Sequence, residues 1–143
     1  MFDYVSRLEE LLLDKFCCSQ ALITLALEVK GNESVEVKQE LLKAMSGLCG
    51  GLGGRGKNCG ALTGGACAIG LFCGRGAVDE VAHDDFNEMI FELVAWFEEE
   101  YGSIECCEIV KNPIDRQTIC PGIMKSTFEK LMQILMEYDV EIN

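Results

Sequence analysis

Apolar side chains recur every three or four residues along most of the chain, and no segment alternates apolar and polar residues with a period of two. The first pattern places an apolar stripe along one face of a helix, whereas the second is typical of a strand with one buried face. The sequence therefore predicts an all-α helical bundle. Its expected helices are marked by Val5 to Leu12, by Ala21 to Val29 with an end near Gly31 and Asn32, by about Ser34 to Ser46, by Phe86 to Phe97 with an end near Gly102, and by Met124 to Tyr138.

A further short helix, rich in glycine, alanine and cysteine, is expected behind a glycine-rich loop at 47–58. Of the 15 glycines, 12 lie between Gly47 and Gly76, a stretch with three basic and no acidic residues. The loop contains G-x-G-x-x-G, but helical sequence precedes it where a dinucleotide-binding fold needs a strand. Asn58 stands where a P-loop needs a serine or threonine hydroxyl. Two interpretations stay open, a flexible connector and a backbone nest that holds an anion.

Two cysteines are expected at helix N-termini, where unpaired N–H groups and the helix dipole favour a thiolate. Cys59 falls in the first turn of the glycine-rich helix if the asparagine before it is the cap. At about 100° per residue, Cys67 and Cys73 would share one broad face with it. Cys120 is expected just ahead of the last helix, because Pro121 suits a first helical turn.

Length and charge narrow the class of protein. The chain has 143 residues, enough for one domain over 1–143 with its own core. Its 24 acidic and 12 basic residues give a net charge of −12. Because such a charge repels the phosphate backbone, we do not expect nucleic acid as a partner. The longest uncharged stretch, Asn58 to Gly74, is shorter than the ~20 residues of a spanning helix, and the acidic N-terminus has no secretory signal core. We therefore expect a cytoplasmic protein without a membrane span.

An acidic segment follows the glycine-rich one. Residues 77–110 contain 11 Asp and Glu residues and no Lys or Arg. Such a run is typical of a solvated helix face, and it is also suited to docking a basic partner protein.

The chain has nine cysteines, none of which form C-x-x-C. Zinc fingers, thioredoxin-type dithiols and bacterial ferredoxins rely on such local pairs, so the sequence excludes all three. An odd number of cysteines in a chain of this length also disfavours a secreted disulfide framework. A cysteine site in this protein must be assembled from separate helices, as helical bundles can do.

Four cysteines stand in distinctive contexts. Cys59 opens C-G-A-L-T-G behind the glycine-rich loop, and Cys18 lies in F-C-C-S-Q-A. Cys106 follows the acidic helix in Y-G-S-I-E-C, and Cys120 comes last. From Cys18 to Cys120 this order resembles the C_GCAxxG_C_C family of redox-active proteins, which is named for four cysteines around such a motif. Five cysteines are extra to the pattern and are each expected to be small buried hydrophobes: Cys17, Cys49, Cys67, Cys73 and Cys107.

The resemblance implies redox activity or metal binding through Cys18, Cys59, Cys106 and Cys120. A related cysteine-rich region occurs in split-Soret cytochromes, where an iron-sulfur centre has been proposed, although this chain lacks C-x-x-C-H for c-type haem. Four thiolates match the needs of an iron-sulfur cluster. We therefore favour a cluster on these cysteines for electron transfer or redox sensing. The basic loop would offset its charge through N–H bonds to sulfur, and the acidic helix would dock a basic redox partner.

Three alternatives stay open. The first is a thiol-disulfide oxidoreductase without metal, in which Cys59 is the redox thiol, activated by Lys57 and its helix N-terminus. The second is a zinc or copper site made of thiolates, with no electron transfer. The third is a helical interaction domain with buried cysteines. Only the first makes the protein an enzyme. A homodimer is also open, because the last helix is apolar.

Overall fold

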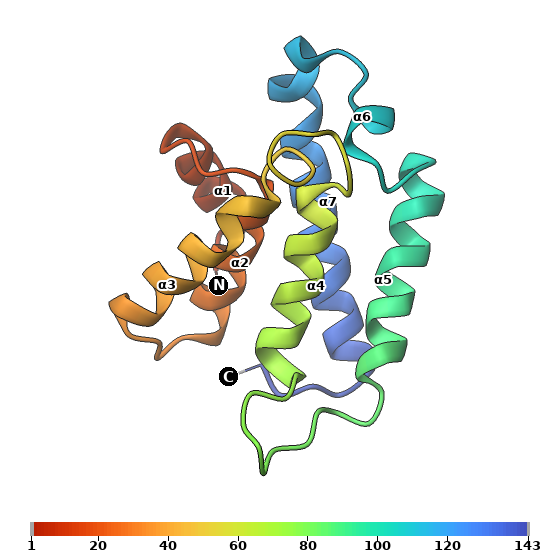
Figure 1. Cartoon of the computed structure of the whole chain (residues 1–143). Coiled ribbons are helices and arrows are strands. Elements are labelled where there is room, and N and C mark those ends of the chain that lie inside the picture. Colours follow the sequence, from red (N-terminus) through yellow and green to blue (C-terminus); the bar gives the residue numbers. More distant parts are fainter. Residues whose placement is uncertain (1, 143) are drawn as a thin grey trace.

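The computed structural model describes residues 2–142 and is all-α, as the hydrophobic pattern predicts (Figure 1). Those residues contain no strand, and one isolated antiparallel bridge joins Asn58 to Glu105. The helices are α1 (Tyr4–Leu13), α2 (Cys18–Lys30), α3 (Val35–Met45), α4 (Gly60–Cys73), α5 (Phe86–Tyr101), α6 (Cys106–Ile109) and α7 (Arg116–Glu137), with 3-10 turns η1 (Ser46–Leu48) and η2 (Pro113–Asp115).

Most helix boundaries follow local capping signals of the sequence. The Asp3 and Ser34 side chains cap α1 and α3 by accepting a backbone N–H from the first turn of each helix. Gly31 and Gly102 end α2 and α5 at φ of +72° and +76°, in a region that glycine occupies at little cost. The first three predicted helices and the acidic one are therefore confirmed.

The helix α7 begins earlier than predicted. It starts at Arg116 and runs through Pro121, so the prediction of a start after Cys120 was wrong. The turn η2 leads directly into α7 and supplies its first turn. The carbonyl that Pro121 leaves without a helical donor belongs to Gln117, which is exposed, so water can satisfy it. As a result, Cys120 lies inside a helix and has no N-terminal activation.

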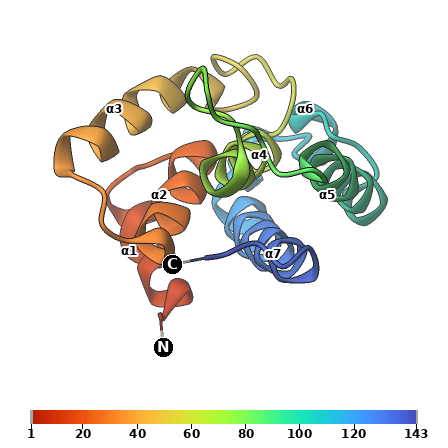
Figure 2. The same cartoon turned by 90° about the horizontal axis from the view of Figure 1, so that it is seen from below.

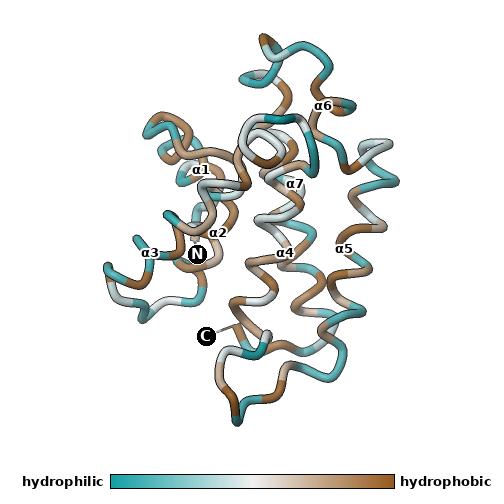
Figure 3. The backbone as a smooth tube through the Cα atoms, in the orientation of Figure 1, coloured by the Kyte–Doolittle hydropathy of each residue, from teal (hydrophilic) through white to brown (hydrophobic). Residues whose placement is uncertain are grey.

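The helices α2 and α4 form the centre of the bundle. The helix α2 packs against α1, α3, α4 and α7, and α4 packs against α2, α5 and α7. Figures 1 and 2 show α4 beside α7, with α5 on one side and α1 to α3 on the other. Hydrophobic and hydrophilic positions alternate along α5 and α7 in Figure 3, as expected of helices with one buried face. Their buried side chains form one apolar cluster with those of α2 and α4.

Glycines bring α2 and α4 into backbone contact. A Cβ added at Gly64 would lie 2.7 Å from Ser19 Cα, and one at Gly60 would lie 3.3 Å from Cys18 Cβ. Because no larger residue fits between these backbones, the start of α4 is held directly against the start of α2. Gly65 makes the same kind of room for α7, since a Cβ there would lie 3.1 Å from Thr127 Cγ2.

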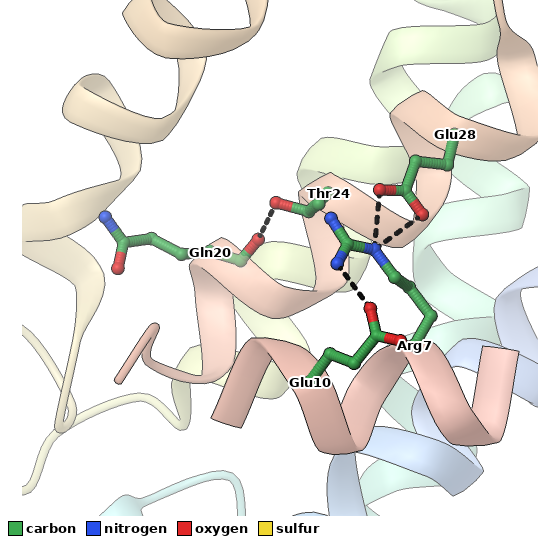
Figure 4. A network of polar contacts seen from close by, with 5 residues as sticks. All are labelled: Arg7, Glu10, Gln20, Thr24 and Glu28. Carbon is green, nitrogen blue, oxygen red and sulfur yellow. Dashed lines mark hydrogen bonds and ion pairs between the residues drawn. The ribbon is translucent and has the colours of Figure 1, made fainter. Parts of the chain in front are cut away.

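Polar contacts hold α1 and α3 against α2, and Figure 4 shows the contact made by α1. The Arg7 guanidinium of α1 donates to Glu28 of α2 at 2.8 Å, which fixes α1 along α2, and it also donates to Glu10 within α1 at 2.9 Å. From the other side of α2, the Gln20 amide donates to the Leu42 carbonyl of α3 at 3.1 Å.

The apolar face of α7 is internal. Met124, Phe128, Leu131 and Leu135 are all buried in the single chain. This face, on which the expectation of a homodimer rested, is therefore used inside the bundle. Across residues 2–142, no helix combines the length and the apolar character needed to cross a membrane.

The backbone contact between α2 and α4 predicts different effects of two alanine substitutions in α4. Gly64→Ala should lower the free energy of unfolding by about 1–3 kcal/mol, because its methyl group meets the Ser19 backbone, which cannot move aside. Gly70→Ala is the matched control: its methyl group would meet only Phe86 at 3.9 Å, so stability should hold or rise by up to about 1 kcal/mol. Denaturant unfolding measures both, and equal effects would contradict the close contact.

Candidate four-cysteine site

The cysteines Cys18, Cys59, Cys106 and Cys120 come from four different elements at one end of the bundle (Figure 1). Cys18 is the first residue of α2, Cys59 is the N-cap of α4, Cys106 opens α6, and Cys120 lies in the second turn of α7. Cys59 and Cys106 are buried, and the other two are half-buried.

A short antiparallel backbone pairing places Cys59 next to Cys106. The Cys59 N–H donates to the Ile104 carbonyl at 2.8 Å, and the Cys106 N–H donates to the Lys57 carbonyl at 2.6 Å. The pairing continues to Gly56, whose φ is +74° and whose added Cβ would lie 2.7 Å from Cys107 Cβ. Glycine is therefore required at 56 both for its conformation and for this close approach.

Each of the four thiols interacts electrostatically with the other three. Cys18 interacts with the other three sulfurs, Cys59 with Cys106 and Cys120, and Cys106 with Cys120. All six pairs therefore lie close enough for the charge on one sulfur to affect the next. The structure thus brings together the four cysteines that the sequence motif singles out.

Cys18 and Cys120 form the tightest of these pairs. Interaction with the Cys120 sulfur raises the pKa of Cys18, as does burial. The same interaction and the nearby Arg116 outweigh burial at Cys120 and lower its pKa to about 7. Near neutral pH, Cys18 therefore keeps its proton while Cys120 is a thiolate.

Cys59 is not the activated thiol that its helix position predicted. Burial raises the pKa of Cys59, and the N–H groups of Ala61 and Leu62 offset this only in part. Lys57 is exposed and contributes its backbone, through the carbonyl that accepts from Cys106, rather than its ammonium group. Burial likewise raises the pKa of Cys106, against the opposing effect of Arg116.

A mostly apolar pocket of about 220 Å³ opens onto the site. Cys18, Cys106 and Cys120 line it, together with Cys17 and Arg116. Its remaining walls come from Leu12, Gly50, Gln117, Pro121 and Met124. Low polarity in such a pocket strengthens the interactions among the sulfurs and the one arginine.

The glycine-rich loop folds on itself beside this pocket. The N–H groups of the six residues 52–57 donate to carbonyls of 47–52, among them Gly53 to Gly47 at 2.9 Å and Gly56 to Gly50 at 3.0 Å. These N–H groups are therefore taken up within the loop. The amides of 52–57 are therefore not available to an anion or to cluster sulfur, contrary to the expectation for that part of the loop.

The five extra cysteines divide into three groups. Cys17 and Cys49 form a disulfide with a Cα–Cα distance of 5.7 Å, so the expectation that each is a buried hydrophobe was wrong. Cys67 and Cys107 are exposed, which also contradicts that expectation, and Cys73 is half-buried. Neither Cys67 nor Cys73 belongs to the four-cysteine site, since no other thiol affects the pKa of either one.

In the part of the chain that the structure describes, no three His, Cys, Asp or Glu side chains are placed to hold a metal ion. The four sulfurs are therefore neighbours without converging on one point.

The family comparison covers most of the chain. Residues 16–134 match the family model described as "Putative redox-active protein (C_GCAxxG_C_C)". The match includes all four cysteines of the site, along with Cys17 and Cys49. Neither a curated protein nor a solved structure matches the chain.

Two features of the site did not come from the sequence pattern. Arg116 stands four residues before Cys120, a spacing that puts both on one helix face. The spacing of Arg116 and Cys120 can be recognised as a signal only when α7 is known to begin at Arg116 and not after Cys120. The pairing of Cys17 with Cys49 had no local signal, because 32 residues separate them.

The lowered pKa of Cys120 predicts its alkylation profile. The reaction of Cys120 with iodoacetamide should rise with pH around a midpoint near 7, since only the thiolate reacts. Cys67, whose pKa burial raises above 9.0, serves as the control within the same protein. Cys18→Ala and Arg116→Gln should each move the Cys120 midpoint upward, because each removes a group that stabilises the thiolate. Peptide mass spectrometry reads both sites, and a midpoint near 9 in the parent protein would contradict the prediction.

Proposed function

We propose, from the premise that the chain belongs to the C_GCAxxG_C_C family, that Cys18, Cys59, Cys106 and Cys120 ligate an iron-sulfur cluster. The protein would then be a small electron carrier or redox sensor. When bound, the cluster supplies one-electron chemistry, while the protein sets its surroundings and its partner.

The observation that carries the proposal is the meeting of four thiols from four separate elements. Each of the four interacts with the other three, and none of the interactions involves a histidine or carboxylate as a further donor. Four thiolates are the donor set of common iron-sulfur clusters and are chemically soft. A dithiol enzyme would need two of these cysteines, and the other two would then have no role.

A cluster does not require its ligand sulfurs to converge on one point, whereas a single metal ion does. A single tetrahedral ion draws its sulfurs to about 2.3 Å from one point. A cluster with several iron atoms holds its ligand sulfurs farther apart, as neighbours around a larger centre. Loading would require Cys18, whose pKa is raised, to give up its proton before its sulfur bonds to iron.

Groups already in place would stabilise the added negative charge. The N–H groups of Ala61 and Leu62, in the first turn of α4, favour the charged form of Cys59. Arg116 lies near Cys106 and Cys120. N–H bonds to sulfur and nearby positive charge both raise the reduction potential of a cluster. This role falls to the α4 N-terminus and Arg116, in place of the glycine-rich loop.

The expected partner is a basic redox protein. Glu98, Glu99 and Glu100 are exposed at the end of α5 that leads to α6 and Cys106. Charge complementarity at this acidic end would speed association with a positively charged surface.

Iron and acid-labile sulfide content tests the proposal. Protein purified without oxygen, or reconstituted with iron and sulfide, should contain the two in near-equal amounts and absorb visible light. Alanine in place of any one of the four cysteines should remove most of the iron. Cys67→Ala and Cys73→Ala are matched controls on α4 that should retain it. A parent protein that takes up no iron, or four variants that all keep it, would overturn the proposal.

A second candidate function follows from the opposite pKa shifts of Cys18 and Cys120. In the metal-free protein, Cys120 is a thiolate near neutral pH and Cys18 lies beside it, as the attacking and resolving thiols of a disulfide reductase do. Reduction of an external disulfide by metal-free protein, abolished by Cys120→Ser and retained by Cys59→Ser, would favour this function over cluster binding.

A further inference from the structure

The Cys17–Cys49 disulfide lies directly beside the four-cysteine site. Cys17 precedes Cys18 in the chain and lines the same pocket as Cys18 and Cys120. Cys49 is the C-cap of η1 and lies within the glycine-rich loop at 47–58. The pocket therefore places a disulfide sulfur in one small cavity with the free thiols of Cys18 and Cys120, whose charges affect each other.

A buried hydroxyl group faces both sulfurs of the disulfide. Ser19 is fully buried, and its Oγ lies 3.3 Å from Cys17 Sγ and 3.9 Å from Cys49 Sγ. Its own proton is donated to the Met45 carbonyl at 2.9 Å. Sulfur in a disulfide has no proton to donate, so the Ser19 lone pairs face it unused. They can accept an S–H as soon as either cysteine becomes a thiol.

We propose that the Cys17–Cys49 disulfide and the Cys18–Cys120 dithiol exchange electrons within the chain, so that the disulfide can occupy either position. The pocket and the Ser19 acceptor carry this inference. The exchange itself needs no cluster, whereas its consequence for the cluster rests on the proposed function.

The exchange balances without an external oxidant. The Cys120 thiolate attacks Cys17 Sγ, the sulfur that lines the pocket, the Cys17–Cys49 bond breaks, and Cys49 leaves as a thiolate. The Cys18 thiol loses its proton and attacks Cys120 Sγ, and Cys17 leaves as a thiolate that takes up a proton. One disulfide breaks and one forms, and two electrons move from the Cys18 and Cys120 sulfurs to those of Cys17 and Cys49.

The position of the disulfide and the binding of a cluster are then linked. A disulfide at Cys18–Cys120 removes two of the four ligands, whereas a disulfide at Cys17–Cys49 leaves all four free. By thermodynamic reciprocity, a bound cluster holds the disulfide at Cys17–Cys49. Loss of the cluster leaves Cys18 and Cys120 free to form the disulfide in place of Cys17 and Cys49. That disulfide protects the two ligand thiols until iron returns.

Differential alkylation of the full, metal-free chain tests the exchange. Cys49 and Cys120 fall on different tryptic peptides, 44–55 and 117–125, so each can be followed separately. Protein with one disulfide is held without oxygen in the presence of a chelator, then quenched with acid and alkylated. We expect free Cys49 to appear as Cys120 becomes blocked, until both forms are present.

Matched variants separate this exchange from general thiol scrambling. In Cys120→Ser, Cys49 should stay blocked, while Cys67→Ser, which removes an exposed thiol outside the pocket, should exchange like the parent. Thermal melts confirm that each variant is folded. If Cys49 stays blocked in the parent, or is freed equally in Cys120→Ser, the proposal is wrong.

Adding iron and sulfide distinguishes the exchange from the cluster proposal. If both proposals hold, loading returns the disulfide to Cys17–Cys49, and Cys49 becomes blocked again. If Cys49 and Cys120 exchange in the metal-free protein but no iron is taken up, the exchange stands and the cluster proposal fails. If iron is taken up but Cys49 is never freed, the cluster proposal stands and the exchange fails.

Discussion

The contact of the α2 and α4 backbones is the constraint on which the rest of the structure depends. Gly60 and Gly64 remove the side chains that would keep the two helices apart, and Ser19 fills the space from the other side. Because the contact lies near the starts of both helices, it fixes Cys18 against Gly60, the residue that follows Cys59. The same glycines that make α4 thin therefore bring two distant cysteines together.

The other two cysteines are positioned in the site by different kinds of interaction. Cys106 is placed by backbone hydrogen bonds between 56–59 and 104–107, which require the left-handed conformation of Gly56. Cys120 is placed by side-chain packing, since the buried face of α7 contacts α4 and α5 and orients the helix. A fault in any one contact would disperse the thiols, so the site and the bundle are built from the same interactions.

Electrostatics then distinguish four chemically identical side chains. Cys59 and Cys106 are buried, and burial raises their pKa. Cys120 is half-buried and interacts with Cys18 and Arg116, so its pKa falls instead. The disulfide at Cys17 and Cys49 adds an oxidised pair within the same pocket as these thiols. Thiols in several protonation and oxidation states therefore share one small apolar space.

The sequence by itself determined the helical class, most helix boundaries and the four cysteines of the motif, because helical periodicity and end caps are local properties of the chain. Val35–Met45 and Phe86–Tyr101 could be read directly from such signals. Tertiary structure decided the rest. Neighbouring elements, not local sequence, determine where α7 begins, which thiol has the lowered pKa, and that Cys17 pairs with Cys49. These outcomes depend on atoms far apart in the chain, whose approach is set by packing.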